Sequence, residues 1–387
     1  MTDLEKINAY VESHREEMLD TYRKVILQES YHSDPEQVRT MGKMFKELFE
    51  EVGFRCQLTD VGTDESGDML TGILGEDRPG KPIIFGGHMD TVHKPGSFPC
   101  QFEVDEEGKV HGPGVLDMKG GIVIALYVCK ALNEIGYQAR PIKICFAPDE
   151  EKLHKHGNTA DQFAEFCKGG EFMLNMETGL PGGDLCVSRK GKTEVALYVE
   201  GVSAHAGNDF ARGRNAIAEL CRKVTEIQAL TDLSVGTTVC VDVIHGGTNF
   251  GAFPAHAEAT FDVRATSVEE MQNVKKKIEE IAQKTYIDGT TTTMEYQMEM
   301  LPFECTEGVM NLYHMVHDIC VEDGFGDFPL KHIGGSSDAA YAVIAGVPAL
   351  CSCGIQGEWN HTTREYAILE SLYTRTKQWA DVINRIK

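Results

Sequence analysis

The sequence predicts an α/β fold, with a mixed, mostly parallel central sheet covered by helices and a smaller α+β domain inserted into it. Two observations predict this. Short apolar runs ending in glycine, proline or polar residues alternate with amphipathic helical segments in the first half and the last quarter of the chain, as in helix-covered parallel sheets. Between them, apolar and polar residues alternate along each predicted strand, as on half-exposed antiparallel strands.

The outer domain is expected at 1–188 and 302–387. Apolar residues three and four positions apart predict its first helices, and short apolar runs predict its buried strands. The helices are predicted at 5–30, 35–53 and 120–135, and the strands at 81–87, 141–147 and 172–175.

The inserted domain is expected at 189–301, where alternating strands and charged helices follow one another. Such a segment forms helices packed on one face of an antiparallel sheet. Its strands are predicted at 193–200, 237–244, 257–265 and 290–298, and its helices at 215–230 and 267–282.

Composition limits the possible partners and compartments. The 387 residues suffice for two or three domains, and the net charge of −23 argues against nucleic acid. No apolar run reaches the ~20 residues that cross a bilayer, and the N-terminus lacks the features of a signal peptide. The twelve cysteines are scattered, which favours free thiols in a reducing compartment. We therefore expect a cytoplasmic protein with no membrane partner, which needs local positive charge to hold any anionic substrate.

Polar residues with metal-binding chemistry follow the predicted strand at 81–87. In open α/β sheets the ligand site lies beyond the carboxyl ends of the strands. His88 and Asp90 are two residues apart and face the same way on an extended chain. The imidazole can bind a metal while the carboxylate orients it. A buried histidine beside a turn aspartate remains the alternative.

Further candidate ligands lie at the other strand-to-loop junctions. Asp117 precedes a predicted helix, where it is either a ligand or an N-cap. The three carboxylates of 149–151 follow a strand; water solvates them on an open surface, but in a cleft only a cation makes them tolerable. Glu177 follows the next strand, and His361 adds a second imidazole near the C-terminus. Imidazole and carboxylate ligands together suit zinc.

Five motifs follow one another in a fixed order along the chain: Gly87–Val92, Gly112–Gly121, Asp149–Glu151, Met176–Gly179 and Ser203–Gly207. This series resembles a known family of di-zinc hydrolases, that of glutamate carboxypeptidase (carboxypeptidase G-like), aminoacylase and succinyl-diaminopimelate desuccinylase. The resemblance runs from about residue 80 to the end of the chain. It implies a zinc-exopeptidase-like catalytic domain and a ferredoxin-like inserted domain that serves as a dimerisation or lid domain in a homodimer.

The resemblance implies a set of metal ligands and a cofactor of two Zn²⁺, for which Co²⁺ or Mn²⁺ are possible substitutes. His88 and Glu177 are expected to bind one zinc. Glu151 and His361 are expected to bind the other. Asp117 would bridge the two ions, and a cis peptide bond would follow it.

The resemblance also implies catalytic and substrate-binding roles. Asp90 would orient His88, and Glu150 would be the general base that activates a metal-bridging water and then protonates the leaving nitrogen. His205 would stabilise the oxyanion in the partner subunit's active site. Arg264 would hold a substrate carboxylate, for which its forked guanidinium is suited, although a strand-face ion pair is the alternative.

The sequence departs from the family pattern at three places. The family usually has asparagine three positions before Pro254; here that position is Gly251, and Asn249 lies two residues earlier. The basic segment 152–156 either shapes an anionic substrate pocket or is a solvated loop. In the glycine-rich segment 334–340, Ser337 either donates to the substrate carboxylate or caps a helix.

The expected function is metal-dependent hydrolysis of an amide bond next to a free carboxylate. The substrate would be a small peptide or an N-acyl amino acid. Because of Gly251, an amide or ureido hydrolase with a different pocket remains open. A non-catalytic binding protein is a third reading, against which Glu150 and the full ligand set argue.

Overall fold

The computed structural model describes residues 1–386, and the contacts within it divide the chain into two compact units. Unit 1 comprises Met1–Ser188, Phe303–Ile333 and the chain from Ser337 onward. Unit 2 comprises Arg189–Pro302 and Gly334–Ser336. No helix of the described part is long and apolar enough to cross a membrane.

A six-stranded mixed sheet forms the centre of unit 1, in the order β1-β2-β6-β3-β7-β14. β6, β3, β7 and β14 run parallel, whereas β2 is antiparallel to both β1 and β6. His88 at the end of β3 lies beside Ala147 at the end of β6, so the loops that follow these strands emerge at one edge of the sheet. The strands are β1 (Arg55–Asp60), β2 (Asp68–Leu74), β3 (Ile83–His88), β6 (Ile142–Ala147), β7 (Phe172–Asn175) and β14 (Ala349–Leu350).

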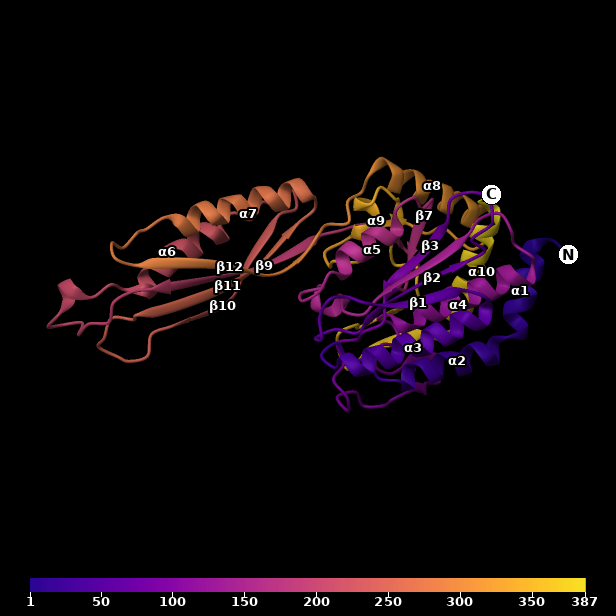
Figure 1. The fold of residues 1–387 in the computed structure, drawn as a ribbon, viewed down its shortest axis with the longest axis horizontal. Coiled ribbons are helices and arrows are strands. Elements are labelled where there is room, and N and C mark those ends of the chain that lie inside the picture. The colour runs from indigo at the N-terminus through magenta and orange to yellow at the C-terminus, as the bar shows by residue number, and fades with distance from the viewer. Residues whose placement is uncertain (387) are drawn as a thin grey trace. The chain divides into compact units, whose positions relative to one another are not determined.

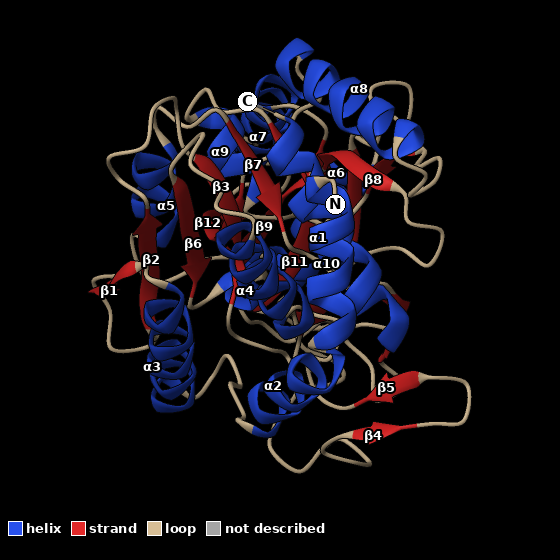
Figure 2. Ribbon diagram, turned by 90° about the vertical axis from the view of Figure 1, so that its right-hand side faces the viewer, coloured by secondary structure: helices blue, strands red, loops and turns tan. Residues whose placement is uncertain are grey.

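Helices cover both faces of this sheet, which confirms the predicted fold class (Figures 1 and 2). α4 packs against β3 and α10, whereas α5 and α9 pack together against β6 and β7. The helix predicted at 5–30 is in fact two helices that meet at His14, whose φ of −110° and ψ of 11° interrupt the helical path. The helices are α1 (Asp3–Ser13), α2 (Arg15–Leu27), α3 (Pro35–Val52), α4 (Lys119–Glu134), α5 (Thr159–Cys167), α8 (Glu307–Glu322), α9 (Ala339–Ile344) and α10 (Leu369–Arg385).

Two smaller sheets hold the long loops of unit 1. One has the order β15-β16-β5-β4, and the other pairs β8 with β13. Tyr366 of β16 pairs with His111 of β5, which brings the segment around His361 beside the loop that leads to Asp117. The strands are β4 (Glu103–Val104), β5 (Lys109–His111), β8 (Leu185–Arg189), β13 (Leu330–Ile333), β15 (Gly357–Glu358) and β16 (Tyr366–Ile368).

Unit 2 is an antiparallel sheet, in the order β10-β11-β9-β12, with two helices on one face. Val195, Leu197 and Val199 of β9 are buried with helix residues in one core. On the other face of β9, Glu194 and Tyr198 are only partly buried, whereas the small Ala196 is buried as well. The alternation in the sequence therefore follows the two faces of the sheet except at Ala196. The elements are β9 (Gly191–Glu200), α6 (Ala216–Gln228), β10 (Thr238–Gly246), β11 (His256–Ala265), α7 (Val268–Gln283) and β12 (Thr291–Met300).

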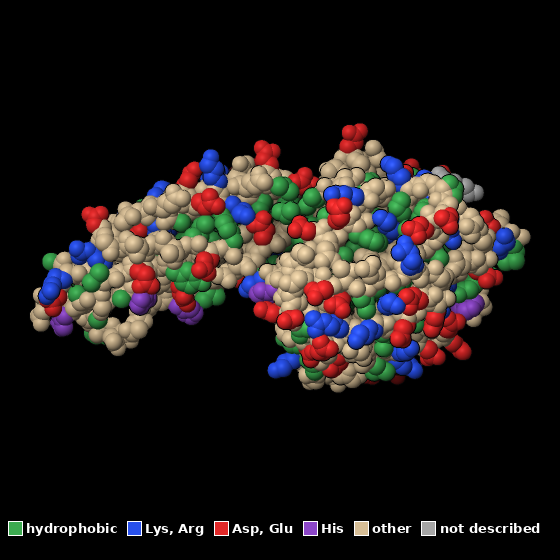
Figure 3. Space-filling view, in the orientation of Figure 1, with side chains coloured by type: hydrophobic (Ala, Val, Ile, Leu, Met, Phe, Trp, Pro, Cys, Tyr) green, Lys and Arg blue, Asp and Glu red, His purple; other side chains and the backbone are tan. Residues whose placement is uncertain are grey.

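The surface of unit 1 mixes charges of both signs. Figure 3 shows acidic and basic side chains interspersed over its visible face. Buried carboxylates, by contrast, are concentrated in the interior, where the loops after β3, β6 and β7 meet; they include Asp90, Asp117, Glu150 and Glu177. A buried concentration of negative charge needs a compensating cation.

Candidate metal centre and active site

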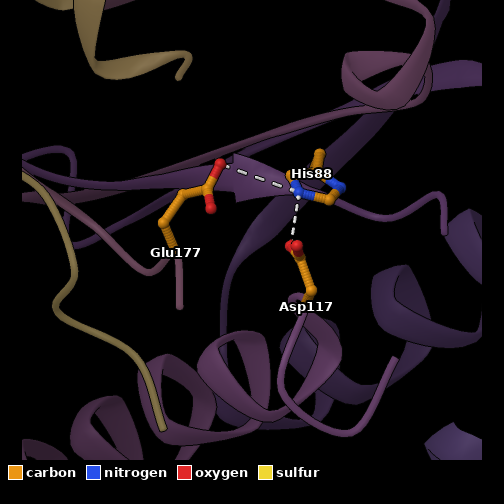
Figure 4. A group of neighbouring side chains, drawn as sticks. All are labelled: His88, Asp117 and Glu177. Atoms are coloured by element: carbon orange, nitrogen blue, oxygen red, sulfur yellow. Dashed lines mark ion pairs between the residues drawn. The ribbon is translucent and has the colours of Figure 1, made fainter. Parts of the chain in front are cut away.

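The first candidate ligand group joins the end of β3 to the loops after β5 and β7. His88 ends β3, Asp117 precedes α4, and Glu177 follows β7; their exposed fractions are 1%, 5% and 4%. His88 Nε2 lies 3.3 Å from Asp117 Oδ1 and 3.7 Å from Glu177 Oε1. Figure 4 shows this imidazole nitrogen pointing toward both carboxylates. The three side chains therefore present their ligand atoms to one small space.

The second group uses the other oxygen of Asp117. His361 Nε2 lies 3.2 Å from Asp117 Oδ2 and 3.3 Å from Glu151 Oε2. Glu151 comes from the 3₁₀ turn Glu150–Lys152, and His361 lies between β15 and β16, with 53% of its side chain exposed. The peptide bond between Asp117 and Met118 is cis. Asp117 is thus shared by two groups, each of one histidine and two carboxylates.

The geometry of both groups fits a metal ion. Ligands 2.0–2.2 Å from a tetrahedral zinc are about 3.3–3.6 Å from each other, close to the separations of 3.2–3.7 Å found here. Asp117 Oδ1 and Glu151 Oε1 are buried and accept no hydrogen bond from the described residues. Burial and the charge of Asp117 raise the pKa of Glu151 to about 7. A cation is what such a carboxylate needs to stay ionised near neutral pH.

Asp90 links the first ligand group to the loop after β6. His88 Nδ1 lies 3.0 Å from the backbone carbonyl oxygen of Asp90 and 3.2 Å from its Oδ1. The proton is therefore assigned to Nδ1, and the lone pair of Nε2 faces the carboxylates. The same carboxylate accepts hydrogen bonds from the backbone N–H groups of Glu150 (3.2 Å) and Glu151 (3.1 Å). Asp90 therefore connects the end of β3 to the loop after β6.

Glu150 is buried beside the first ligand group without belonging to either group. Its exposed fraction is 8%, and its Oε2 lies 4.0 Å from His88 Nε2. Burial, together with the charges of Glu177 and Glu151, raises the pKa of Glu150 well above its usual range, although His88 opposes this shift. A carboxyl group with a raised pKa exchanges protons readily near neutral pH.

Two further residues hold Asp117, and the sequence did not identify either. Glu365 Oε1 accepts hydrogen bonds from the backbone N–H groups of Leu116 (2.8 Å) and Asp117 (3.1 Å), while its Oε2 meets His93 Nε2 at 2.5 Å. Asn360 donates to Asp117 Oδ2 at 3.0 Å. Both flank His361 in the sequence, and that proximity is the one signal that could have suggested them.

The basic segment 152–156 matches neither of its two interpretations as a whole. Lys155 and His156 are exposed, as in a solvated loop. His154, in contrast, is 7% exposed, and its ring nitrogens meet Asp149 and Asp338. The segment therefore combines a solvated part with one buried histidine.

Ser337 lies inside unit 1 beside the end of β7. It is 1% exposed. Its Oγ accepts hydrogen bonds from Asn175 Nδ2 (2.6 Å) and from the backbone N–H of Ala339 (3.3 Å), at the start of α9. Ser337 lies one residue before Asp338, the N-cap of α9, which makes no side-chain cap bond, so the contact with Ala339 is a local turn and not a helix cap. A contact of Ser337 with substrate stays a prediction.

The remaining predicted site residues belong to unit 2, whereas all five predicted metal ligands belong to unit 1. Arg264 Nε and Nη2 bind both carboxylate oxygens of Asp262, at 2.8 and 3.0 Å, and Nη1 donates to the carbonyl of Gly334. Its role in holding substrate stays a prediction. Asn249 is exposed on the loop between β10 and β11.

His205 lies on an exposed loop of unit 2 with one ring nitrogen occupied. The backbone N–H groups of Gly207 and Asn208 both donate to His205 Nδ1, at 3.1 Å each. Nδ1 is therefore the acceptor, and the proton of the neutral ring is assigned to Nε2. The loop is held against Gly251, whose carbonyl accepts the N–H of Ala206 at 2.9 Å.

At the loops beyond the strand ends of this α/β sheet, two groups of one histidine and two carboxylates share one aspartate. This combination of fold and site is that of a metallohydrolase. The sequence model of peptidase family M20/M25/M40 matches residues 84–385, and the chain belongs to this family. It is therefore a metal-dependent hydrolase of amide bonds.

Curated relatives are similar to most of the chain, and solved structures share its fold. Carboxypeptidase G2 from Pseudomonas sp. (strain RS-16) is 26% identical over 370 residues, covering 95% of this chain and 88% of the relative. A succinyl-diaminopimelate desuccinylase from Methylocella silvestris is 25% identical over 358 residues, covering 86% of this chain and 89% of the relative. A tripeptidase from Staphylococcus aureus has a similar fold, with a TM-score of 0.79, 17% identity, and coverage of 96% of this chain and 98% of that chain. An M20 family metallo-carboxypeptidase from Sulfolobus solfataricus also has a similar fold, with a TM-score of 0.76, 14% identity, and coverage of 95% of this chain and 98% of that chain.

Proposed function

We propose that this chain is a dinuclear zinc hydrolase that cleaves an amide bond next to a free carboxylate, in a small peptide or an N-acyl amino acid. The observation that carries the proposal is Asp117, which offers one oxygen to His88 and Glu177 and the other to His361 and Glu151. The names of the relatives, a carboxypeptidase and a desuccinylase, support this substrate class.

The ligand assignment follows from the two groups. His88, Asp117 and Glu177 would hold one ion, and Asp117, Glu151 and His361 the other. When bound, two such ions polarise an amide carbonyl and lower the pKa of the attacking water. Zinc suits the imidazole and carboxylate atoms, and Co²⁺ or Mn²⁺ would fit the same set.

Glu150 would move the proton in this reaction. Its carboxyl group lies beside the first ligand group, within reach of a water held there, and would take a proton from that water. It would then give that proton to the leaving nitrogen. Asp90 would keep the Nε2 lone pair of His88 available to a metal and fix the backbone that carries Glu150.

By family analogy, we propose roles for two residues of unit 2. Because Nδ1 of His205 is occupied by two backbone donors, its Nε2–H is left exposed as a donor for an oxyanion. By family analogy, that oxyanion would form in the partner subunit of a homodimer, and unit 2 would be the dimerisation or lid domain. Arg264 would exchange part of its pairing with Asp262 for the carboxylate of the substrate.

A second candidate function is hydrolysis of another amide or of a ureido acid. Gly251 favours it, because it stands where the family usually has asparagine, so the contact that this asparagine would make with substrate is missing here. A Cβ atom built on Gly251 would meet nothing within 4 Å, so no other side chain is seen to take its place.

We place the enzyme in the cytoplasm. All twelve cysteines lie within the described residues, and each is a free thiol in the structure. Free thiols in this number are typical of a reducing compartment.

Metal analysis combined with a substrate panel tests the proposal. Purified protein is expected to contain two transition-metal ions per chain, to lose turnover with a chelator, and to regain it with Zn²⁺, Co²⁺ or Mn²⁺. The panel compares N-acyl amino acids, dipeptides and ureido acids, each with and without a free carboxylate. Protein without metal, and without rescue by any added metal, would end the proposal. Turnover restricted to ureido acids would favour the second candidate.

A further inference from the structure

The chain turns back on itself directly after Glu150 and Glu151. Leu153 and His154 both have a φ of 53°, in the left-handed region that non-glycine residues rarely occupy. Such a conformation persists where surrounding contacts hold it. The turn carries the imidazole of His154 inward, where only 2% of its side chain is exposed.

Both ring nitrogens of His154 meet a buried carboxylate. Nδ1 lies 2.7 Å from Asp149 Oδ1, and Nε2 lies 2.7 Å from Asp338 Oδ1. Asp149 is 2% exposed and Asp338 is fully buried. An ionised carboxylate only accepts, so with both carboxylates ionised both ring nitrogens donate, and the ring is assigned as an imidazolium. Burial alone lowers the pKa of His154, but the charge of Asp338 and the bonds to both carboxylates outweigh it and raise that pKa well above 6.5.

The two carboxylates belong to segments that are distant in the sequence. Asp149 directly precedes Glu150, and its backbone carbonyl accepts the N–H of His154 at 3.1 Å. Asp338 directly precedes α9 and follows Ser337, whose Oγ is bound to Asn175 at the end of β7. His154 thus connects the loop after β6 to the segment packed beside β7.

We propose that His154 is a positioning residue, which locks the loop of Glu150 and Glu151 by bridging Asp149 and Asp338 and supplies the positive charge that these two carboxylates share. This role rests on the proposed function of Glu150 and Glu151. The bridge holds one side of the loop that carries Glu150 and Glu151. Asp90 holds the other side, because its carboxylate accepts the backbone N–H groups of both glutamates. Two anchors on one short loop leave it a single conformation.

The first test is His154→Gln, which removes the charge and one of the two bonds but keeps a donor of similar length. At saturating zinc, kcat per folded molecule is expected to fall about 10–100-fold, as for other residues that orient metal and catalytic groups, with KM little changed. His156→Gln is the matched control, because His156 is exposed on the same loop and pairs with Glu65 at 3.2 Å. The control is expected to keep the wild-type kcat.

A double-mutant cycle with Asp338→Asn separates positioning from a general effect on folding. Asp338→Asn alone weakens one bond of the bridge and is expected to lower kcat by a smaller factor. In the His154→Gln background, Asp338→Asn is expected to lower kcat no further, or to restore part of it. The reason is that Asp338→Asn then removes a buried carboxylate that has lost its cation. Should His154→Gln fold poorly, Asp338→Asn on its own still tests the bridge.

Three results would overturn the inference. One is a wild-type kcat per folded molecule in His154→Gln, and another is a wild-type kcat in Asp338→Asn. The third is a cycle in which the two losses simply multiply. Glu150→Gln, measured in parallel, separates this failure from a failure of the proposed function: an active Glu150→Gln would contradict the general base, whereas an inactive Glu150→Gln beside an active His154→Gln contradicts the bridge alone.

Discussion

Gly121 in α4 sets how closely this helix approaches the loop that carries Glu177. A Cβ atom built on Gly121 would lie 1.8 Å from the carbonyl oxygen of Met176, the residue directly before Glu177. Real Cβ atoms essentially never come closer than 3.0 Å to such an atom, so Gly121→Ala must separate the helix and the loop by at least 3.0 − 1.8 = 1.2 Å. Overpacking of this kind costs about 1–3 kcal/mol of stability. A misplacement of ~1 Å at a catalytic site costs roughly 10²-fold in rate.

The assay for Gly121→Ala is metal content and kcat, measured well below the unfolding temperature. We expect the variant to bind less metal at limiting zinc and to lose about two orders of magnitude in kcat. Gly308→Ala is the matched control in the first turn of α8, where a Cβ would meet its nearest atoms at ordinary distances of 3.6 and 3.7 Å. Wild-type metal content and kcat in Gly121→Ala would refute the claim that this close approach positions Glu177.

Three other substitutions test separate parts of the structure. Glu150→Gln should keep both metals and lose about 10²–10⁴-fold in kcat, as measured by elemental analysis and steady-state kinetics; undiminished activity would remove the general-base assignment. His205→Ala should lower kcat by about 10²–10³ without loss of metal, and a fall in metal content would contradict the oxyanion role. Glu219→Gln should destabilise unit 2 by about 3–5 kcal/mol in chemical unfolding, because it breaks the fully buried pair with Lys223 (3.3 Å). An unchanged unfolding midpoint would show that the backbone carbonyls around Lys223 suffice to hold its charge.

Helices and strands with a regular hydrophobic period, or with a capping residue that marks where they begin, were predictable from the sequence. β7 matches its predicted bounds of 172–175, and every predicted element of unit 2 lies within two residues of its observed bounds. Alternating burial fixes the period of a strand, and a cap fixes the start of a helix, as Ser267 does for α7 by accepting from Glu270 N. The break at His14 was not predictable, because the apolar spacing continues across it on both sides.

Site residues were predictable from the sequence where a metal-binding side chain stands at the end of a predicted strand. They were not predictable where the role depends on a contact between residues that are distant in the sequence. His88 and Glu177 follow adjacent parallel strands, so their proximity follows from the topology. Glu365 reaches the backbone of Asp117 across 248 residues, and His154 reaches Asp338 across 184. No local pattern encodes such a contact, because it depends on how separate segments pack in three dimensions.

The arrangement around Asp90 explains why metal binding and base chemistry cannot vary independently in this chain. One fully buried carboxylate faces Nδ1 of His88 and also accepts the backbone N–H groups of Glu150 and Glu151. Any movement of Asp90 therefore displaces a ligand of each metal group together with the proposed base. Buried acidic groups this close together repel one another, so the loop holds its shape only while hydrogen-bond donors and cations face every carboxylate. The donors come from the backbone and from the bridge at His154, and the metal ions proposed at Asp117 would supply the remaining positive charge.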